Sequence, residues 1–454
     1  MTDQEPLQSQ SRLVRPGSDQ SAHSGGSFFG QGLTKLFRQT AKKAVIHRID
    51  QLRKGAITLV DQESELLLGN SSEKSQWHAH IRVLDSRFYS LCVQQGSLGF
   101  AQGYLDGYWE TDDLTKLLQI FVRDISITHT KPTLTQRVLT PLKRVAHGLK
   151  QNTKIGSRKN IAAHYDLGNE LFELFLDPTM TYSCGIFEHQ DSSLHEASLA
   201  KLDRICKKLD LNPSDHVLEI GTGWGSFAIH AAKNYGCRVT TTTISKEQHA
   251  LASKRVREAG LENQITLLLE DYRDLEGQYD KLVSIEMIEA VGHKFLDTYF
   301  GSCSNLLKPD GQMLIQAITM PDQRYQKYLR TVDFIQHFVF PGSCCPSPKA
   351  ISDSVARATN LRSVHLEDLT PHYPTTLGHW RTKFMESIDT VQALGYPKRF
   401  ERLWEYYLCY CQAGFNERYI GTVQIMFNKP ECRTQSILPS IRESVQKQTA
   451  ERVS

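Results

Sequence analysis

The chain has 454 residues and a formal net charge of +3, with 40% hydrophobic and 23% charged residues. This length accommodates two or three domains, and no stretch approaches the roughly 20 uncharged apolar residues that a membrane-spanning helix needs. The ten cysteines are scattered without a C-x-x-C pair, so neither a metal site nor a disulfide framework is predicted. These features indicate a soluble protein of a reducing cytoplasm.

The N-terminal part begins with an uneven composition. Residues 1–30 are rich in Gln, Ser and Gly and are predicted to be a disordered tail. Over 33–54, apolar residues recur at helical spacing and seven Lys or Arg residues are opposed only by Asp50. Such a basic amphipathic helix can lie on an anionic membrane surface, and a merely solvated basic face is the alternative.

Residues 31–125 are predicted to form a small N-terminal α+β domain. Strands are expected at 57–60 and 80–84, a helix at 86–93, and turns with aromatic packing within Gly96–Trp109.

A basic linker is predicted over 126–159. Every charged residue between Asp124 and Asp166 is positive, and there are eight of them. Such cations suit phospholipid head groups, at roughly 1 kcal/mol each near an anionic surface. The segment lacks the interleaved aromatic residues of a single-strand nucleic-acid platform. A plain basic linker remains the alternative.

Helices and strands alternate from about residue 160 to 432, and residues 433–454 are predicted to be a C-terminal tail. This alternation predicts a doubly wound, mostly parallel α/β sheet, in which ligands bind at the carboxyl ends of the strands. The expected helices are 194–209, 226–232 and 247–259, and the expected strands are 217–220, 238–244, 265–269, 280–285 and 312–318. The aromatic run Trp404–Phe415 has helical spacing, which favours core packing, with an acyl tunnel as the alternative.

A glycine-rich turn follows the first of these strands, in Val217–Gly225. Gly221, Gly223 and Gly225 let the backbone turn sharply and approach a ligand closely, ahead of a helix N-terminus. The G-x-G-x-G spacing differs from the G-x-G-x-x-G of dinucleotide folds. The turn predicts a site for a nucleotide-like ligand.

The ends of the next strands narrow the ligand class. The second strand ends in Thr241–Ser245 without the acid that holds a ribose in dinucleotide folds, so NAD is disfavoured. The third delivers Glu270–Arg273, an acid and an aromatic face suited to adenine. Glu286 and Glu289 follow the fourth and could share one face of a helical turn, with a structural role expected for at least one.

Collinear motifs extend this pattern from about residue 160 to 430, and Gly96–Trp109 adds a further match. Together they resemble the cyclopropane fatty-acyl-phospholipid synthase family of S-adenosylmethionine-dependent methyltransferases. The motifs that carry the resemblance are Ala163–Asn169, Leu176–Cys184, Val217–Gly225, Thr243–Gln248, Asp271–Asp274, Glu289–Gly292, Phe340–Gly342 and Tyr373–Leu377.

The resemblance implies a class I, Rossmann-like methyltransferase domain behind a small N-terminal domain, with S-adenosylmethionine as cofactor. By matched position, Gly221 and Gly223 would contact the methionine part and Glu219 would support the turn. The remaining cofactor residues implied in this way are Tyr182, Ser183, Thr243, Ile244, Gln248, Asp271, Tyr272 and Arg273.

The implied reaction is carbon transfer to a cis double bond, followed by proton loss from a carbocation-like centre that a dry, aromatic pocket shields. In the family the base is a bound bicarbonate, held by Cys, Glu, His, a backbone group at Ile and Tyr. Cys184, Glu289, Ile318 and Tyr373 match those positions, but Gln316 stands in place of the His. Gln can donate a hydrogen bond but cannot carry a proton near neutral pH, which puts the product in doubt.

We therefore predict carbon transfer to an unsaturated acyl chain of a membrane phospholipid, forming a cyclopropane ring, by a cytoplasmic enzyme peripherally bound to the inner membrane face. The alternatives are a methylene- or methyl-branched product, a soluble small-molecule substrate, and an inactive lipid-binding protein. A homodimer is left open, as is a reductase partner for a branched product. No nucleic-acid partner is expected.

Overall fold

The computed structural model describes residues 28–70, 72, 76–124 and 167–434. The predicted basic linker and nearly all of the two predicted tails lie outside the described residues. Within the described part of the chain, no helix is both long and apolar enough to cross a membrane.

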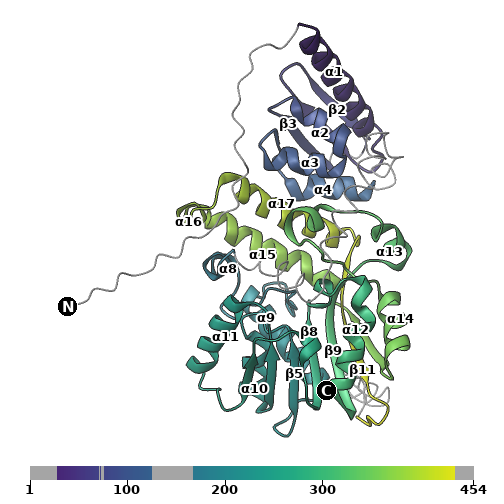
Figure 1. Cartoon of the computed structure of the whole chain (residues 1–454). Coiled ribbons are helices and arrows are strands. Elements are labelled where there is room, and N and C mark those ends of the chain that lie inside the picture. The colour runs from purple at the N-terminus through teal and green to yellow at the C-terminus, as the bar shows by residue number, and fades with distance from the viewer. Residues whose placement is uncertain (1–27, 71, 73–75, 125–166, 435–454) are drawn as a thin grey trace, which may run out of the picture.

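A small four-stranded sheet with helices forms the N-terminal domain, at one end of the molecule (Figure 1). The sheet order is β2-β1-β3-β4; β1 runs parallel to β3, and the other two pairings are antiparallel. The strands are β1 (Ala56–Val60), β2 (Glu65–Gly69), β3 (His78–Val83) and β4 (Trp109–Glu110). The helices are α1 (Phe28–Asp50), α2 (Arg87–Gln95), α3 (Ser97–Leu105) and α4 (Leu114–Arg123).

The segment that was expected to form turns, within Gly96–Trp109, is mostly the helix α3, so that prediction was wrong. Its glycines serve close packing: a Cβ added to Gly99 would lie 2.0 Å from the carbonyl oxygen of Leu91. A Cβ added to Gly103 would lie 3.2 Å from the Trp109 ring. Glycine therefore lets α3 approach α2 and the buried indole.

The predicted basic helix is α1, and the apolar side of its C-terminal half is covered, whereas Phe37 is exposed. Ala41, Val45 and Ile49 are buried in the core of the N-terminal domain. Lys42 forms an ion pair with Asp61, at 2.7 Å between Nζ and Oδ2. A membrane contact of α1 would therefore use exposed basic side chains rather than insertion of these apolar residues.

The second sheet has seven strands in the order β10-β11-β9-β8-β5-β6-β7. The five strands from β9 to β7 are mutually parallel, as predicted, whereas β11 is antiparallel to both of its neighbours. The two edge-side strands β10 and β11 had no counterpart in the sequence reading. The strands are β5 (His216–Ile220), β6 (Arg238–Thr242), β7 (Ile265–Leu268), β8 (Tyr279–Ile285), β9 (Leu307–Thr319), β10 (Arg362–Asp368) and β11 (Gly421–Asn428).

Each face of this sheet is covered by helices over its own apolar core. On one face, α9 (Leu194–Lys208), α10 (Ser226–Tyr235) and α11 (Lys246–Glu258) bury a cluster around Val217 and Val239. On the other, α12 (Leu296–Leu306) and α14 (Pro348–Ala358) cover the cluster around Met313 and Phe427. This doubly wound arrangement explains why β5 and β6 are buried at successive positions rather than at alternate ones.

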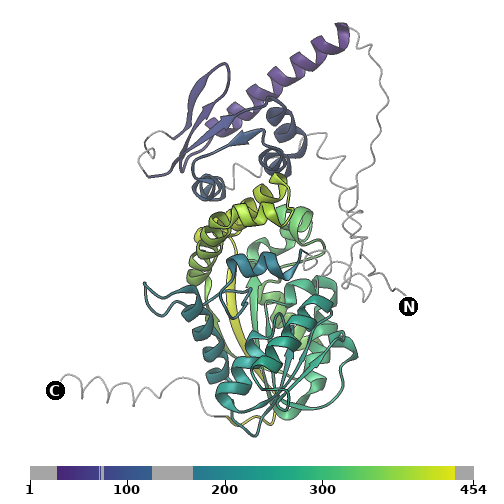
Figure 2. The same ribbon diagram turned by 90° about the vertical axis from the view of Figure 1, so that its left-hand side faces the viewer.

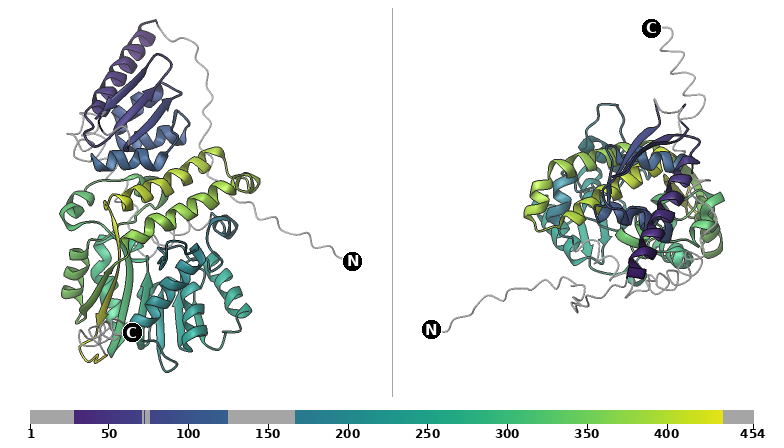
Figure 3. Two further views of the ribbon diagram at one scale, coloured as in Figure 1. Left: turned by 180° about the vertical axis from the view of Figure 1, so that it is seen from behind. Right: turned by 90° about the horizontal axis from the view of Figure 1, so that it is seen from above.

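Two long helices, α15 (Tyr373–Glu386) and α17 (Lys398–Asn416), lie between the sheet and the N-terminal domain (Figures 1, 2 and 3). The aromatic run Trp404–Phe415 belongs to α17, as predicted, and both of its end residues are buried. Hydrogen bonds join the two domains here: Tyr104 Oη donates to Glu405 at 2.7 Å, and Thr115 Oγ1 donates to Gln412 at 3.0 Å.

Candidate active site

The carboxyl ends of the parallel strands open onto a cavity of about 1300 Å³. The cavity continues past α17 to residues of α1 and α2 in the N-terminal domain. Its volume exceeds the roughly 300–1,000 Å³ of an ordinary small-molecule site, which leaves room for more than a cofactor. All predicted cofactor residues line it: Tyr182, Ser183, Glu219, Gly221, Gly223, Thr243, Ile244, Gln248, Asp271, Tyr272 and Arg273.

The glycine turn follows β5, where the strand order reverses. Gly221 and Gly223 have φ angles of +104° and +53°, in the region that favours glycine. A Cβ at Gly223 would meet no protein atom within 4 Å, so it would project into open space of the cavity. The turn therefore presents bare backbone to a ligand at the switch point of the sheet, where open α/β sheets bind ligands.

Buried hydrogen bonds hold the turn in place. Glu219 accepts a bond from Thr241 Oγ1 at 2.6 Å, and Thr222 and Thr241 share a hydroxyl contact of 2.7 Å. Burial raises the pKa of Glu219 to about 8. Threonines stand at the end of β6, where a dinucleotide fold has an acid. One of them, Thr241, ties β6 to the glycine turn.

Polar side chains also follow β6 and β7. Thr243 Oγ1 donates to Gln248 Oε1 at 2.9 Å, and this amide is buried at the start of α11. Arg273 makes a two-bond ion pair with Asp271, with both N–O distances at 2.7 Å. Beside them Tyr272 offers an aromatic face to the cavity. Hydroxyl, amide, carboxylate and ring are the groups that recognise a nucleoside, so S-adenosylmethionine fits this end.

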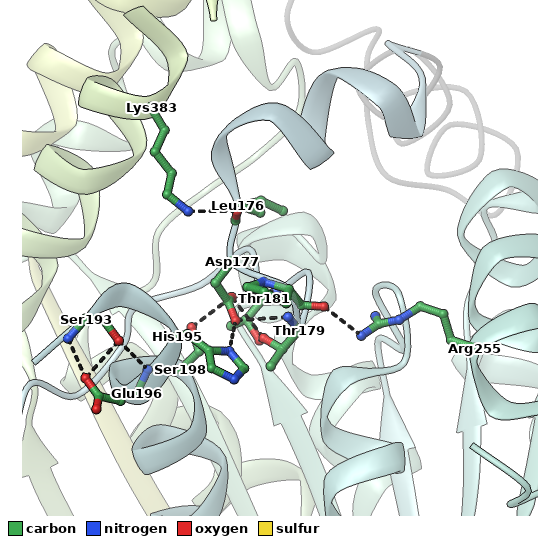
Figure 4. Close-up of polar contacts among 11 residues, drawn as sticks. Leu176, Asp177, Thr179, Thr181, Ser193, His195, Glu196, Ser198, Arg255 and Lys383 are labelled. Carbon is green, nitrogen blue, oxygen red and sulfur yellow. Dashed lines mark hydrogen bonds and ion pairs between the residues drawn. The ribbon is translucent and has the colours of Figure 1, made fainter. Parts of the chain in front are cut away.

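The segment that leads to Cys184 is anchored by Asp177, which is 2% exposed (Figure 4). Its carboxylate accepts bonds from His195 Nδ1 at 2.9 Å and from Ser198 Oγ at 3.0 Å, both on α9. It also accepts one from the backbone N–H of Thr179 at 2.9 Å. These bonds fix the path of the chain into Tyr182, Ser183 and Cys184.

At the other end of the cofactor region, three predicted catalytic residues converge on Glu286. The Cys184 backbone N–H donates to Glu286 Oε1 at 3.0 Å, and Gln316 Nε2 donates to the same oxygen at 2.8 Å. Tyr373 Oη donates to Oε2 at 2.5 Å. Glu286 was considered from sequence only as a neighbour of Glu289, because nothing in a one-dimensional motif shows where these donors meet.

Only some of the predicted catalytic residues line the cavity. Glu286, Glu289, Ile318 and Tyr373 line it, whereas Cys184 and Gln316 are fully buried and are not among its lining residues. The Cys184 thiol donates to the carbonyl of Gly185 at 3.3 Å, and burial holds its pKa well above the usual range. Cys184 therefore reaches the site through its backbone amide.

Glu289 holds a different position. Its Oε1 accepts the backbone N–H of Ile318 at 2.5 Å, while Oε2 is buried without a protein partner. Burial first, and the charge of Glu286 second, raise its pKa to about 8. The two glutamates do not share a helical turn: Glu289 lies in a short 3₁₀ turn at Ile288–Ala290, and Glu286 precedes it with φ of +48°.

A second row of polar residues supports the site from behind. Strand register places Gln424 of β11 opposite Gln316 of β9. Gln424 Nε2 donates to Gln316 Oε1 at 3.0 Å, and Lys208 Nζ donates to Gln424 Oε1 at 2.7 Å. The lysine fixes one amide and that amide fixes the next, so Gln316 turns its nitrogen toward Glu286 and the Cys184 carbonyl. Sequence reasoning missed Gln424 and Lys208, which belong to no motif.

A buried cation, Lys201 of α9, lies between the two ends of the cavity. Its Nζ donates to Ser183 Oγ at 3.1 Å, and burial lowers its pKa to about 8. The charges of Glu286 and Glu219 act in the opposite direction on that pKa. Lys201 is thus the local counter-charge for the carboxylates of the site.

The bicarbonate expected from the resemblance does not fit the donors as they stand. The hydrogens of the Cys184 amide and the Tyr373 hydroxyl, and one from Gln316, point to Glu286. The Ile318 N–H is used by Glu289. A chain carboxylate occupies each of these donors, so they offer no free hydrogen to a further anion.

A doubly wound sheet with residues suited to bind a nucleoside after β5, β6 and β7 defines a class I S-adenosylmethionine-dependent methyltransferase. The comparisons place it further: residues 152–425 match the family model of mycolic acid cyclopropane synthetase, so the chain belongs to that family.

Named relatives agree. The chain is 40% identical to tuberculostearic acid methyltransferase UfaA1 of Mycobacterium tuberculosis, over 73% of this chain and 78% of the relative. It is 37% identical to cyclopropane-fatty-acyl-phospholipid synthase of Escherichia coli K12, over 77% and 88%. Among solved structures, cyclopropane synthase CmaA1 with SAH and CTAB aligns at TM-score 0.57 and 32% identity, covering 60% of this chain and 98% of that one.

Proposed function

We propose that this enzyme transfers a one-carbon unit from S-adenosylmethionine to the cis double bond of an unsaturated acyl chain in a membrane phospholipid, forming a cyclopropane ring. The observation that carries the proposal is the cavity itself. It joins the cofactor residues to Glu286 and Tyr373 and then continues beside the aromatic face of α17 toward the N-terminal domain. The similarity to the E. coli enzyme supports the substrate class.

The aromatic lining supplies the dry wall that the reaction needs. Tyr407 and Phe415 of α17 and Trp380 of α15 line the cavity near Tyr373, whose ring stacks on Phe415 at 4.2 Å between centroids. Aromatic faces stabilise a developing cation, and excluding water prevents its capture. When bound, S-adenosylmethionine supplies the electrophilic carbon; the chain's residues orient it, exclude water and hold the proton acceptor.

The direct test uses labelled cofactor and oleoyl phospholipid vesicles, at several salt concentrations. We expect label in the lipid, and its absence at every salt concentration would contradict the proposal. Peripheral binding at the inner membrane face is part of the same proposal. It predicts activity that depends on anionic vesicles and weakens as salt screens the basic surface.

A methylene- or methyl-branched product is the second candidate, because Gln316 occupies the position of the family His and cannot itself carry a proton. The name of the M. tuberculosis relative, a methyltransferase rather than a cyclopropane synthase, is compatible with it. Proton NMR of the modified lipid separates the two: upfield ring protons show cyclopropane and vinylic signals show methylene. A methyl branch would further require a reductase partner.

A further inference from the structure

We infer that Glu286 is the catalytic base of this enzyme and takes the place of a bound bicarbonate; the inference rests on the proposed function. The Glu286 carboxylate accepts bonds from the Cys184 N–H (3.0 Å), Gln316 Nε2 (2.8 Å) and Tyr373 Oη (2.5 Å). These donors belong to three of the five positions by which the resemblance predicted that the free anion would be held, with Gln316 in place of the His. The chain therefore carries its own carboxylate in the anion site.

The hydrogens of these donors are already used in bonds within the chain. A tyrosine hydroxyl and a backbone amide have one hydrogen each, and both are directed at Glu286. The Gln316 amide has two, of which one bonds Glu286 and the other points to the Cys184 carbonyl at 3.4 Å. Bicarbonate could bind here only by displacing the glutamate, which would leave a second anion in the same buried space.

The backbone at Glu286 supports a functional role. Its φ of +48° lies in the left-handed region, which is unfavourable for a residue with a side chain compared with the right-handed form. Glycine adopts this conformation without that cost. Such strain persists at sites where a side chain is held for function. Here the strained backbone carries the carboxylate to its three donors.

Position in the cavity distinguishes Glu286 from Gln316. Gln316 lies behind it and does not line the cavity, so of these two side chains it is the carboxylate that faces an acyl chain. An amide cannot accept a proton near neutral pH, whereas a carboxylate can. Burial raises the pKa of Glu286, whereas the bonds from Tyr373, Cys184 and Gln316 and the charge of Lys201 lower it and favour the ionised form.

The step balances without an added reactant. The π electrons of the double bond form the new carbon–carbon bond, and the cofactor's carbon–sulfur bond breaks with its electron pair left on sulfur. A C–H bond of the transferred carbon then breaks; its proton moves to a Glu286 oxygen, and its electron pair closes the ring onto the cationic carbon. Glu286 later returns the proton to solvent.

Binding of ¹³C-bicarbonate, followed by NMR, tests the inference without any assumption about the lipid. The wild-type protein is expected to bind none. Glu286→Gly removes the carboxylate, frees its three donors and relieves the backbone strain, so this variant is expected to fold and to bind the ion. Asp210→Gly is the matched control, because Asp210 has a φ of +51° and is exposed away from the site; it should bind no bicarbonate.

Activity on oleoyl phospholipid vesicles provides the second readout. In buffer free of carbon dioxide, the wild type should keep its rate when bicarbonate is added. Glu286→Gly should lose about 100-fold or more and regain part of that rate with bicarbonate. Glu286→Gln should lose as much without rescue, because its amide fills the space.

A wild type that binds bicarbonate and depends on it would overturn the inference, as would full activity of Glu286→Gly without it. Failure of the proposed function looks different: no protein, in any buffer, would label the lipid. The NMR comparison would still decide whether the glutamate occupies the anion site.

Discussion

The two ends of the cavity are built in different ways. At the cofactor end, most of the predicted cofactor residues lie in a short segment at the tip of one strand, as with Gly221 after β5 and Asp271 after β7. At the reaction end, four segments distant in sequence meet at one carboxylate: Cys184, Gln316 and Tyr373 bond Glu286. The cofactor end is thus sensitive to local backbone, and the reaction end to long-range hydrogen bonding.

The largest effect is expected from a side chain in the glycine turn. Gly223→Val would project into the cavity and force β-branched bulk onto a φ of +53°. Affinity for S-adenosylmethionine, measured by calorimetry, should fall about 100-fold or more, which is roughly 3 kcal/mol.

The matched control for this variant is Gly260→Val. Gly260 has a φ of +68° and equally open surroundings, but it is exposed at the end of α11. The Gly260→Val variant therefore has a similar backbone strain at a position away from the cofactor site. Equal loss of affinity in both variants would show that strain, rather than blocked space, explains the effect.

The second largest effect is expected at the reaction end of the cavity. Tyr373→Phe removes one charge-assisted hydrogen bond to Glu286, which is worth about 1.5–3 kcal/mol. We expect kcat to fall about 10- to 100-fold, with unchanged cofactor affinity. The control is Tyr235→Phe, which removes a comparable bond to Asp203 on the α9–α10 surface. Weaker cofactor binding in Tyr373→Phe would contradict the separation of the two ends.

A smaller effect is expected from Gln424→Glu, which keeps shape but removes the donor that orients Gln316. The Gln316 amide should then turn its oxygen toward Glu286, lowering kcat about 10-fold with little change in KM. The matched control is Gln312→Glu. Gln312 lies on β9, the strand of Gln316, and its Oε1 also accepts a bond from a lysine, Lys281, at 2.6 Å. A loss in both variants would indicate general destabilisation.

The smallest effect concerns stability and pH. In the folded protein the pKa of Glu289 is raised from 4.5 to about 8, so the folded state keeps a proton that the unfolded state has lost. The free energy of unfolding should therefore fall as pH rises through that window. Glu289→Gln should show a smaller fall in urea unfolding between about pH 5 and about pH 8. Glu262→Gln, on the exposed surface, should follow the wild type.

Much of the cofactor end could be predicted from sequence, because its parts are local. The glycines of 221 and 223 and the absent acid after β6 are readable in a short window, and all the residues named for the cofactor line one cavity. The reaction end was predicted only in part. Cys184, Glu289, Ile318 and Tyr373 came from a resemblance, and that resemblance predicted a bound bicarbonate at the site rather than the carboxylate of Glu286.

The amino-acid sequence by itself determined the alternating α/β order and a glycine turn for a nucleotide-like ligand, since these depend on periodicity and on φ angles that only glycine adopts easily. The choice of S-adenosylmethionine as cofactor came from the family resemblance of the motifs. The tertiary structure decided which donors meet at Glu286 and how the Gln316 amide is turned. It also inserted β11 between β9 and β10, which brings Gln424 to Gln316. Such contacts join positions more than 100 residues apart, and chain order alone does not encode their distance.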